Sequence, residues 1–87
     1  MIEADLKLGR CYRGKRPGVC GQGYVNDRQI IYLGMFEVQY DGMMVPFGGR
    51  HKKCSIAAFL KWAGSDVTDQ LPPGEWELYR DYLARQK

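Results

Sequence analysis

Apolar and polar residues alternate on both sides of an Asp-Gly pair in the middle of the chain. Residues 36–40 are Phe-Glu-Val-Gln-Tyr, and residues 43–47 are Met-Met-Val-Pro-Phe. Such alternation is typical of a strand with one buried face, and Asp-Gly favours a two-residue hairpin turn. We therefore expect a hairpin that turns at 41–42. Three apolar pairs would share its buried face: Phe36 with Phe47, Val38 with Val45, and Tyr40 with Met43.

Further short strands are expected before this hairpin. Residues 28–33 are rich in β-formers, and Gly34-Met35 separates them from residue 36 by a length that suits a second hairpin. Residues 8–13 form a weaker strand candidate, and residues 19–25 a kinked one that two glycines interrupt. Four to five short strands with tight connections indicate a small antiparallel sheet or partial barrel.

Two helices are expected after the strands. Ser55 can cap a helix over 56–63, in which Ile56, Phe59 and Leu60 share one face. A loop over 65–71 follows. Residues 75–85 then begin with acids and end with bases, in agreement with a helix dipole. We expect this second helix to close the open side of the sheet. Its apolar stripe consists of Trp76, Tyr79, Tyr82 and Leu83.

These elements predict one α+β domain over the 87 residues, strand-rich over 6–48 and helical over 55–86, with both helices packed on the sheet. The layout resembles SH3-like small barrels in outline. That resemblance implies no site residue, because no peptide-binding motif of that family is present in the sequence.

Basic residues gather in two acid-free segments. The net charge is only +3, but residues 6–17 hold five bases and residues 42–62 hold four. If folding brings the two segments together, they form a patch that attracts phosphates. The sequence therefore favours binding of DNA or RNA through the strand-side surface. The residues expected to contact it are Arg10, Arg13, Lys15, Arg16, Arg50, Lys52 and Lys53, with Tyr12 stacking on a base. Reversal of charge at Arg13 and Lys52 is expected to abolish binding without unfolding the domain.

Protein binding is the alternative function. Pro46 cannot donate to a strand ladder, which indicates an edge strand. That edge, the outward side of the hairpin (Glu37, Gln39, Met44) and the aromatic final helix could dock a protein partner or a second copy of the chain.

The sequence contains little that points to catalysis or to cofactor binding. The one histidine, His51, has no evident orienting partner. The glycine-rich segment 14–23 lacks the Gly-Lys-Ser/Thr ending of a phosphate loop. A zinc site is a weak alternative, and its ligands would be Cys11, Cys20, His51 and Cys54. We therefore expect a non-enzymatic domain without a cofactor or a metal.

The compartment is expected to be the cytoplasm. The cysteine count is odd, which suits free thiols in a reducing environment. The acidic start of the chain does not resemble a signal peptide, and no apolar run is long enough to span a bilayer.

Overall fold

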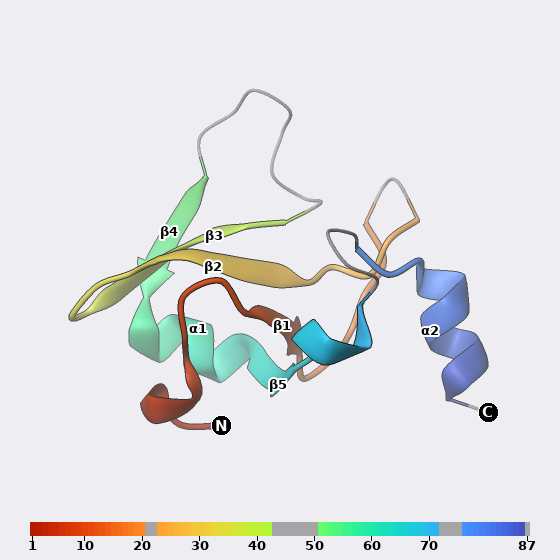
Figure 1. Cartoon of the computed structure of the whole chain (residues 1–87), viewed down its shortest axis with the longest axis horizontal. Helices are drawn as coiled ribbons and strands as arrows, with labels where there is room; N and C mark the ends of the chain where they lie inside the picture. Colours follow the sequence, from red (N-terminus) through yellow and green to blue (C-terminus); the bar gives the residue numbers. More distant parts are fainter. Residues whose placement is uncertain (21–22, 43–50, 72–75, 87) are drawn as a thin grey trace.

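Five short strands form one open antiparallel sheet (Figure 1). The structure, a computed structural model, describes residues 1–20, 23–42, 51–71 and 76–86. The strand order is β4-β3-β2-β1-β5. The strands are β1 (Cys11–Gly14), β2 (Arg28–Leu33), β3 (Glu37–Asp41), β4 (Lys52–Ser55) and β5 (Ala63–Asp66). With two helices beside this sheet, the predicted α+β class is confirmed, and the sheet does not close into a barrel.

Helix α1 (Ile56–Trp62) covers one face of the sheet. Its first turn is capped as predicted: the hydroxyl oxygen of Ser55 accepts a hydrogen bond from the N–H of Ala58 at 3.0 Å. The chain then enters β5 directly, so the loop expected over 65–71 is wrong in its first part. Residues 68–70 form a short 3-10 helix, η2 (Thr68–Gln70), and another, η1 (Glu3–Asp5), lies near the N-terminus.

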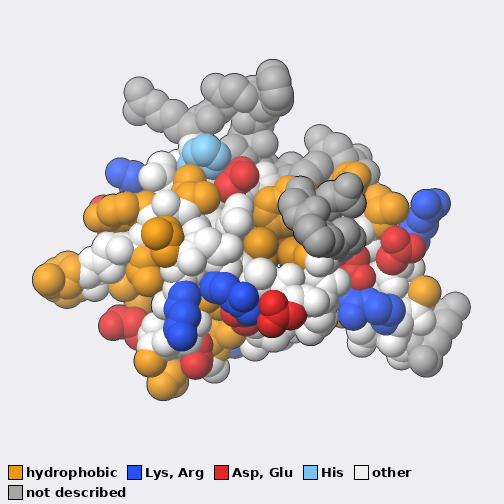
Figure 2. All heavy atoms as spheres, viewed as in Figure 1, with side chains coloured by type: hydrophobic (Ala, Val, Ile, Leu, Met, Phe, Trp, Pro, Cys, Tyr) orange, Lys and Arg blue, Asp and Glu red, His pale blue; other side chains and the backbone are white. Residues whose placement is uncertain are grey.

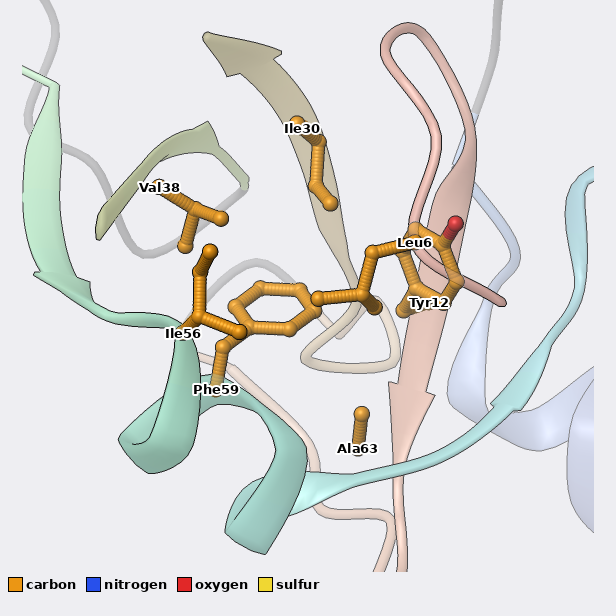
Figure 3. Packing of buried hydrophobic residues seen from close by; sticks show 7 residues of the cluster. All are labelled: Leu6, Tyr12, Ile30, Val38, Ile56, Phe59 and Ala63. Carbon is orange, nitrogen blue, oxygen red and sulfur yellow. The ribbon is translucent and has the colours of Figure 1, made fainter. Parts of the chain in front are cut away.

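The core lies between α1 and the sheet, with Phe59 at its centre (Figure 3). The Phe59 ring meets Tyr12 edge-on, with 5.6 Å between ring centroids, and meets Trp62 at 5.4 Å. Edge-to-face ring pairs of this kind stabilise a fold beyond the area they bury. The buried residues of this cluster are Leu6, Tyr12, Ile30, Val38, Ile56, Phe59 and Ala63.

The hairpin of β2 and β3 is confirmed, with its turn at the predicted place. The N–H of Gly34 donates to the carbonyl of Glu37 at 2.9 Å and closes the turn. An irregularity between Ile30 and Tyr32 inserts one residue into β2. Such a bulge bends the strand locally.

The hairpin predicted at 41–42 is wrong. Val38 lies opposite Leu33 of β2 on one side and opposite Cys54 of β4 on the other. Both edges of β3 are thus occupied at Val38, so β3 does not have the predicted register. The predicted partner strand 43–47, with Met43, Met44, Pro46 and Phe47, lies outside the described residues, and so does Arg50. The alternation itself is confirmed in part, because Val38 is buried and Tyr40 packs against the core.

The C-terminal helix α2 (Tyr79–Arg85) starts four residues later than predicted. It lies at the end of the molecule opposite the β2–β3 turn (Figure 1), and none of its residues, all of which are described, is buried. The predicted closure of the sheet by this helix is therefore wrong, because α1 already covers the core. An isolated bridge between Tyr24 and Leu78 attaches the segment before α2.

The kinked strand expected over 19–25 is also wrong. Val19 bridges to Val25 in antiparallel fashion, and the N–H of Cys20 donates to the carbonyl of Tyr24. The segment therefore folds back on itself instead of running along the sheet. Among the helices that the structure describes, none has both the length and the apolar character to cross a membrane.

Candidate functional site

Arg13 forms the centre of a buried charge cluster. Its Nε and Nη2 donate to the two carboxylate oxygens of Asp27, both at 2.9 Å, and Nη2 also donates to Glu77 at 2.8 Å. Arg85 completes the cluster by binding both oxygens of Glu77. Burial acts to lower the pKa of Arg13, but its bonds to the carboxylates outweigh this effect and raise the pKa.

This environment corrects the role predicted for Arg13. The residue is only 4% exposed, and Asp27 and Glu77 neutralise its charge, so it cannot reach a phosphate. Arg13→Glu would place a third carboxylate in the cluster. The charge reversal suggested by the sequence is thus expected to unfold the domain.

The predicted stacking role of Tyr12 is wrong as well. The residue is 0% exposed, since it lies on the face of β1 that α1 covers. Its hydroxyl donates to the carbonyl of Asp5 and accepts from the N–H of Lys7, both at 2.8 Å. Tyr12 is a core residue that anchors the N-terminal segment.

The other predicted cations that the structure describes do not form one patch. Arg10 is paired with Asp66 at 2.8 Å and with Asp69 at 3.3 Å. Lys15 follows β1, whereas Lys52 begins β4, and β2 and β3 lie between them. With about 4.8 Å between neighbouring strands, the three strand spacings alone separate the two positions by roughly 14 Å across the sheet. The side chains that remain exposed are those of Lys15, Arg16, Lys52 and Lys53.

Arg28 lies between these two groups of cations and is not among the contact residues expected from the sequence. Its guanidinium lies over the rings of Tyr40 and Trp62, at 4.6 and 4.0 Å from their centroids. Cation–π contacts of this kind hold a cation in place. The guanidinium of Arg28 also covers one face of the Tyr40 ring and one face of the Trp62 ring. Neither of these two faces is therefore open to stacking by a nucleic-acid base.

The structure does not assemble the zinc site considered from the sequence. Cys54 belongs to β4 and Cys11 to β1, again three strands apart. Among the residues described, no three Cys, His, Asp or Glu side chains are arranged to hold a metal. The Nε2 atom of His51 lies 3.5 Å from the carboxylate of Asp41. Burial raises the pKa values of Cys11 and Cys54, which disfavours their thiolate forms.

The most conspicuous surface is apolar and lies at the turn between β2 and β3. Met35 is 80% exposed and Phe36 is 78% exposed, and Tyr32 beside them is also exposed. Figure 2 shows hydrophobic side chains at the left end of the molecule, where Figure 1 places the turn between β2 and β3. We call this region the hairpin-tip surface, and it borders a shallow hollow of about 420 Å³. The residues that line the hollow are Tyr32, Met35, Phe36, Glu37 and Ser55.

Local backbone geometry produces this exposure. Gly34 and Met35 form the turn, and the turn places Phe36 beyond the last pair of the β2–β3 ladder, Leu33 with Val38. The Tyr32 ring lies across the turn, so a Cβ on Gly34 would lie 2.8 Å from its hydroxyl oxygen. Phe36 was expected to be buried because the sequence suggested Phe47 as its partner. The tight turn at 34–35 was the available signal for its exposure.

Strand β4 runs beside the hairpin-tip surface and is an edge of the sheet. It pairs with β3 on one side, and no strand within the described residues pairs with its other side. Its Lys52 and Lys53 are exposed, and its last residue, Ser55, lines the hollow. An apolar hollow and an unpaired, basic strand edge therefore adjoin each other.

Comparison of the chain with models of protein families, with curated proteins and with solved structures gave no match.

Proposed function

We propose that the chain is a non-catalytic protein-binding module that docks its partner on the hairpin-tip surface. The observation that carries this proposal is the exposure of Met35 and Phe36 next to each other at a turn that backbone hydrogen bonds hold in place. Large apolar side chains that gather on a surface are typical of interaction sites, whereas single exposed ones are common everywhere.

Burial of the exposed apolar side chains at this surface would supply binding free energy for a protein contact. Burial of a Phe or Met side chain contributes about 1.5–3 kcal/mol. Aromatic residues are also enriched among those that dominate interface energies, and methionine adapts its shape to different partners. Together, Met35, Phe36 and Tyr32 can anchor a partner's apolar side chain in the hollow.

Nucleic-acid binding, which the charge pattern favoured, is the weaker candidate. Of its predicted contacts, Tyr12 and Arg13 are buried and Arg10 is paired with carboxylates. What still supports it is that Lys15 and Lys52 both lie at the same end of the sheet, with Arg28 between them.

Selection from a library of random displayed peptides tests the proposal. Peptides selected on the wild-type chain are expected to lose at least about tenfold in affinity for Phe36→Ser, because one anchor is worth more than about 1.4 kcal/mol. Leu8→Ser is the matched control, since Leu8 is an apolar residue that is 64% exposed away from the tip. It should leave the affinity unchanged.

Two outcomes would contradict the proposal. One is that no selected peptide distinguishes Phe36→Ser from Leu8→Ser. The other is that the chain binds random-sequence DNA or RNA with an affinity that falls steeply with salt and depends on Lys15 and Lys52 but not on Phe36.

A further inference from the structure

We propose that the partner supplies an extended, acidic segment, which adds as a sixth strand along the edge of β4 that faces away from β3 and inserts an apolar side chain into the hollow of the hairpin-tip surface. This inference rests on the proposed function, because it uses the same surface. It specifies the conformation of the ligand, its charge and the strand edge that it contacts.

The backbone of β4 has hydrogen-bonding groups to offer. The N–H of Ile56 donates to the carbonyl of Phe36 at 2.8 Å, so Ile56 faces β3. Backbone groups of an antiparallel strand alternate between its two sides. Cys54 therefore also faces β3, and the N–H and C=O of Lys53 and the N–H of Ser55 face outward. An added strand can pair with these three groups, each contributing about 0.5–1.5 kcal/mol.

The charge of this edge selects the ligand. Lys52 and Lys53 are adjacent and exposed, and neither forms an ion pair within the described part of the chain. Lysines on an edge strand hinder pairing with a second, equally basic strand. A second copy of this chain would bring its own two lysines to the same short ladder, whereas an acidic segment would neutralise them.

The positions of Lys53 and of the hollow together determine the spacing between an acidic and an apolar residue in the ligand. Cys54 packs against the core, so Lys53 and Ser55 lie on the opposite face of β4, the face of the hollow. Residues two apart on a strand share a face at a separation of about 7 Å. An acidic residue beside Lys53 therefore stands two positions from the apolar residue that reaches the hollow beside Ser55.

Synthetic peptides of about eight residues, the length of an ordinary strand, test this inference by fluorescence anisotropy. The first peptide alternates Thr and Val and carries one Asp two positions from a Leu, and in the second Lys replaces that Asp. We expect the Asp peptide to bind at least about tenfold more tightly at low salt. Lys53→Glu should reverse this preference. Lys61→Glu, the same change at an exposed site on α1, should preserve it.

Backbone methylation of the Asp peptide tests strand addition itself. N-methyl groups on the alternate amides that face β4 should weaken binding at least about tenfold, and methyl groups on the other amides should not. Equal effects of the two methylation patterns, or equal binding of the Asp and Lys peptides, would overturn the inference. If peptides from the library still depended on Phe36 in that case, the proposed function would stand and only strand addition would fail. The chain could instead form a dimer in the absence of peptide, one that Lys53→Glu strengthens or Phe36→Ser dissociates. This result would show that a second copy of the chain binds the edge, and it would also overturn the inference.

Discussion

Replacement of Asp27 by Asn tests the buried charge cluster most directly. The substitution keeps the size of the side chain and removes its charge. Asp27 is 0% exposed, and both of its carboxylate oxygens accept hydrogen bonds from Arg13. An amide offers only one acceptor, and its NH₂ group would face an N–H of the guanidinium. Arg13 would then share the single carboxylate of Glu77 with Arg85.

The expected loss is a large part of the total stability. Removal of one partner from a buried ion pair costs about 3–5 kcal/mol, because the other charge remains buried. The total free energy of unfolding for a chain of this length is roughly 4–13 kcal/mol. At about 4 °C per kcal/mol, a loss of about 3 kcal/mol corresponds to a decrease in Tm of about 12 °C.

Thermal and urea unfolding followed by circular dichroism measure this loss. Asp69→Asn is the matched control: it breaks an exposed contact with Arg10 and should cost less than about 0.5 kcal/mol. Arg13→Met combined with Asp27→Asn should cost less than the sum of the two single changes, because Glu77 and Arg85 still pair. A loss of less than about 1 kcal/mol for Asp27→Asn would refute the reasoning that Arg13 depends on this carboxylate.

Two further predictions concern the β1–β5 side of the sheet. Gly14→Ala should destabilise the fold by about 1–3 kcal/mol in urea unfolding, because the new Cβ would lie 2.7 Å from Nε1 of Trp62. An unchanged unfolding midpoint would contradict this prediction and would show that the indole ring moves aside. Burial acts to raise the pKa of Asp66, but hydrogen bonds from Arg10 and Thr68 outweigh it and hold the pKa below its usual value. This contribution to stability is present above the unfolded pKa of about 3.9 and is lost as the pH falls through the lower folded pKa. The stability difference between wild type and Asp66→Asn should therefore shrink in strong acid, and a difference that is equal at neutral and acidic pH would contradict the assignment.

Local features of the sequence determined several elements by themselves. Ser55 caps α1, because a hydroxyl directly before a helix can reach the third N–H that follows it. The β-forming run at 28–33 and the Gly34-Met35 turn specify the β2–β3 hairpin, since its partners are close in sequence. The alternation over 36–40 also placed Val38 and Tyr40 on the core side.

Only the tertiary structure decided which strands meet and which charges are buried. Asp-Gly at 41–42 has a strong local preference for a turn, but β4, which leads directly into α1, occupies that edge of β3. Arg13 belongs to a basic segment in the sequence, yet it is neutralised by Asp27 and by Glu77, which is 64 positions away. Composition and periodicity describe the preference of each segment, whereas the pairing of distant segments depends on the total burial and charge pairing that the folded chain achieves.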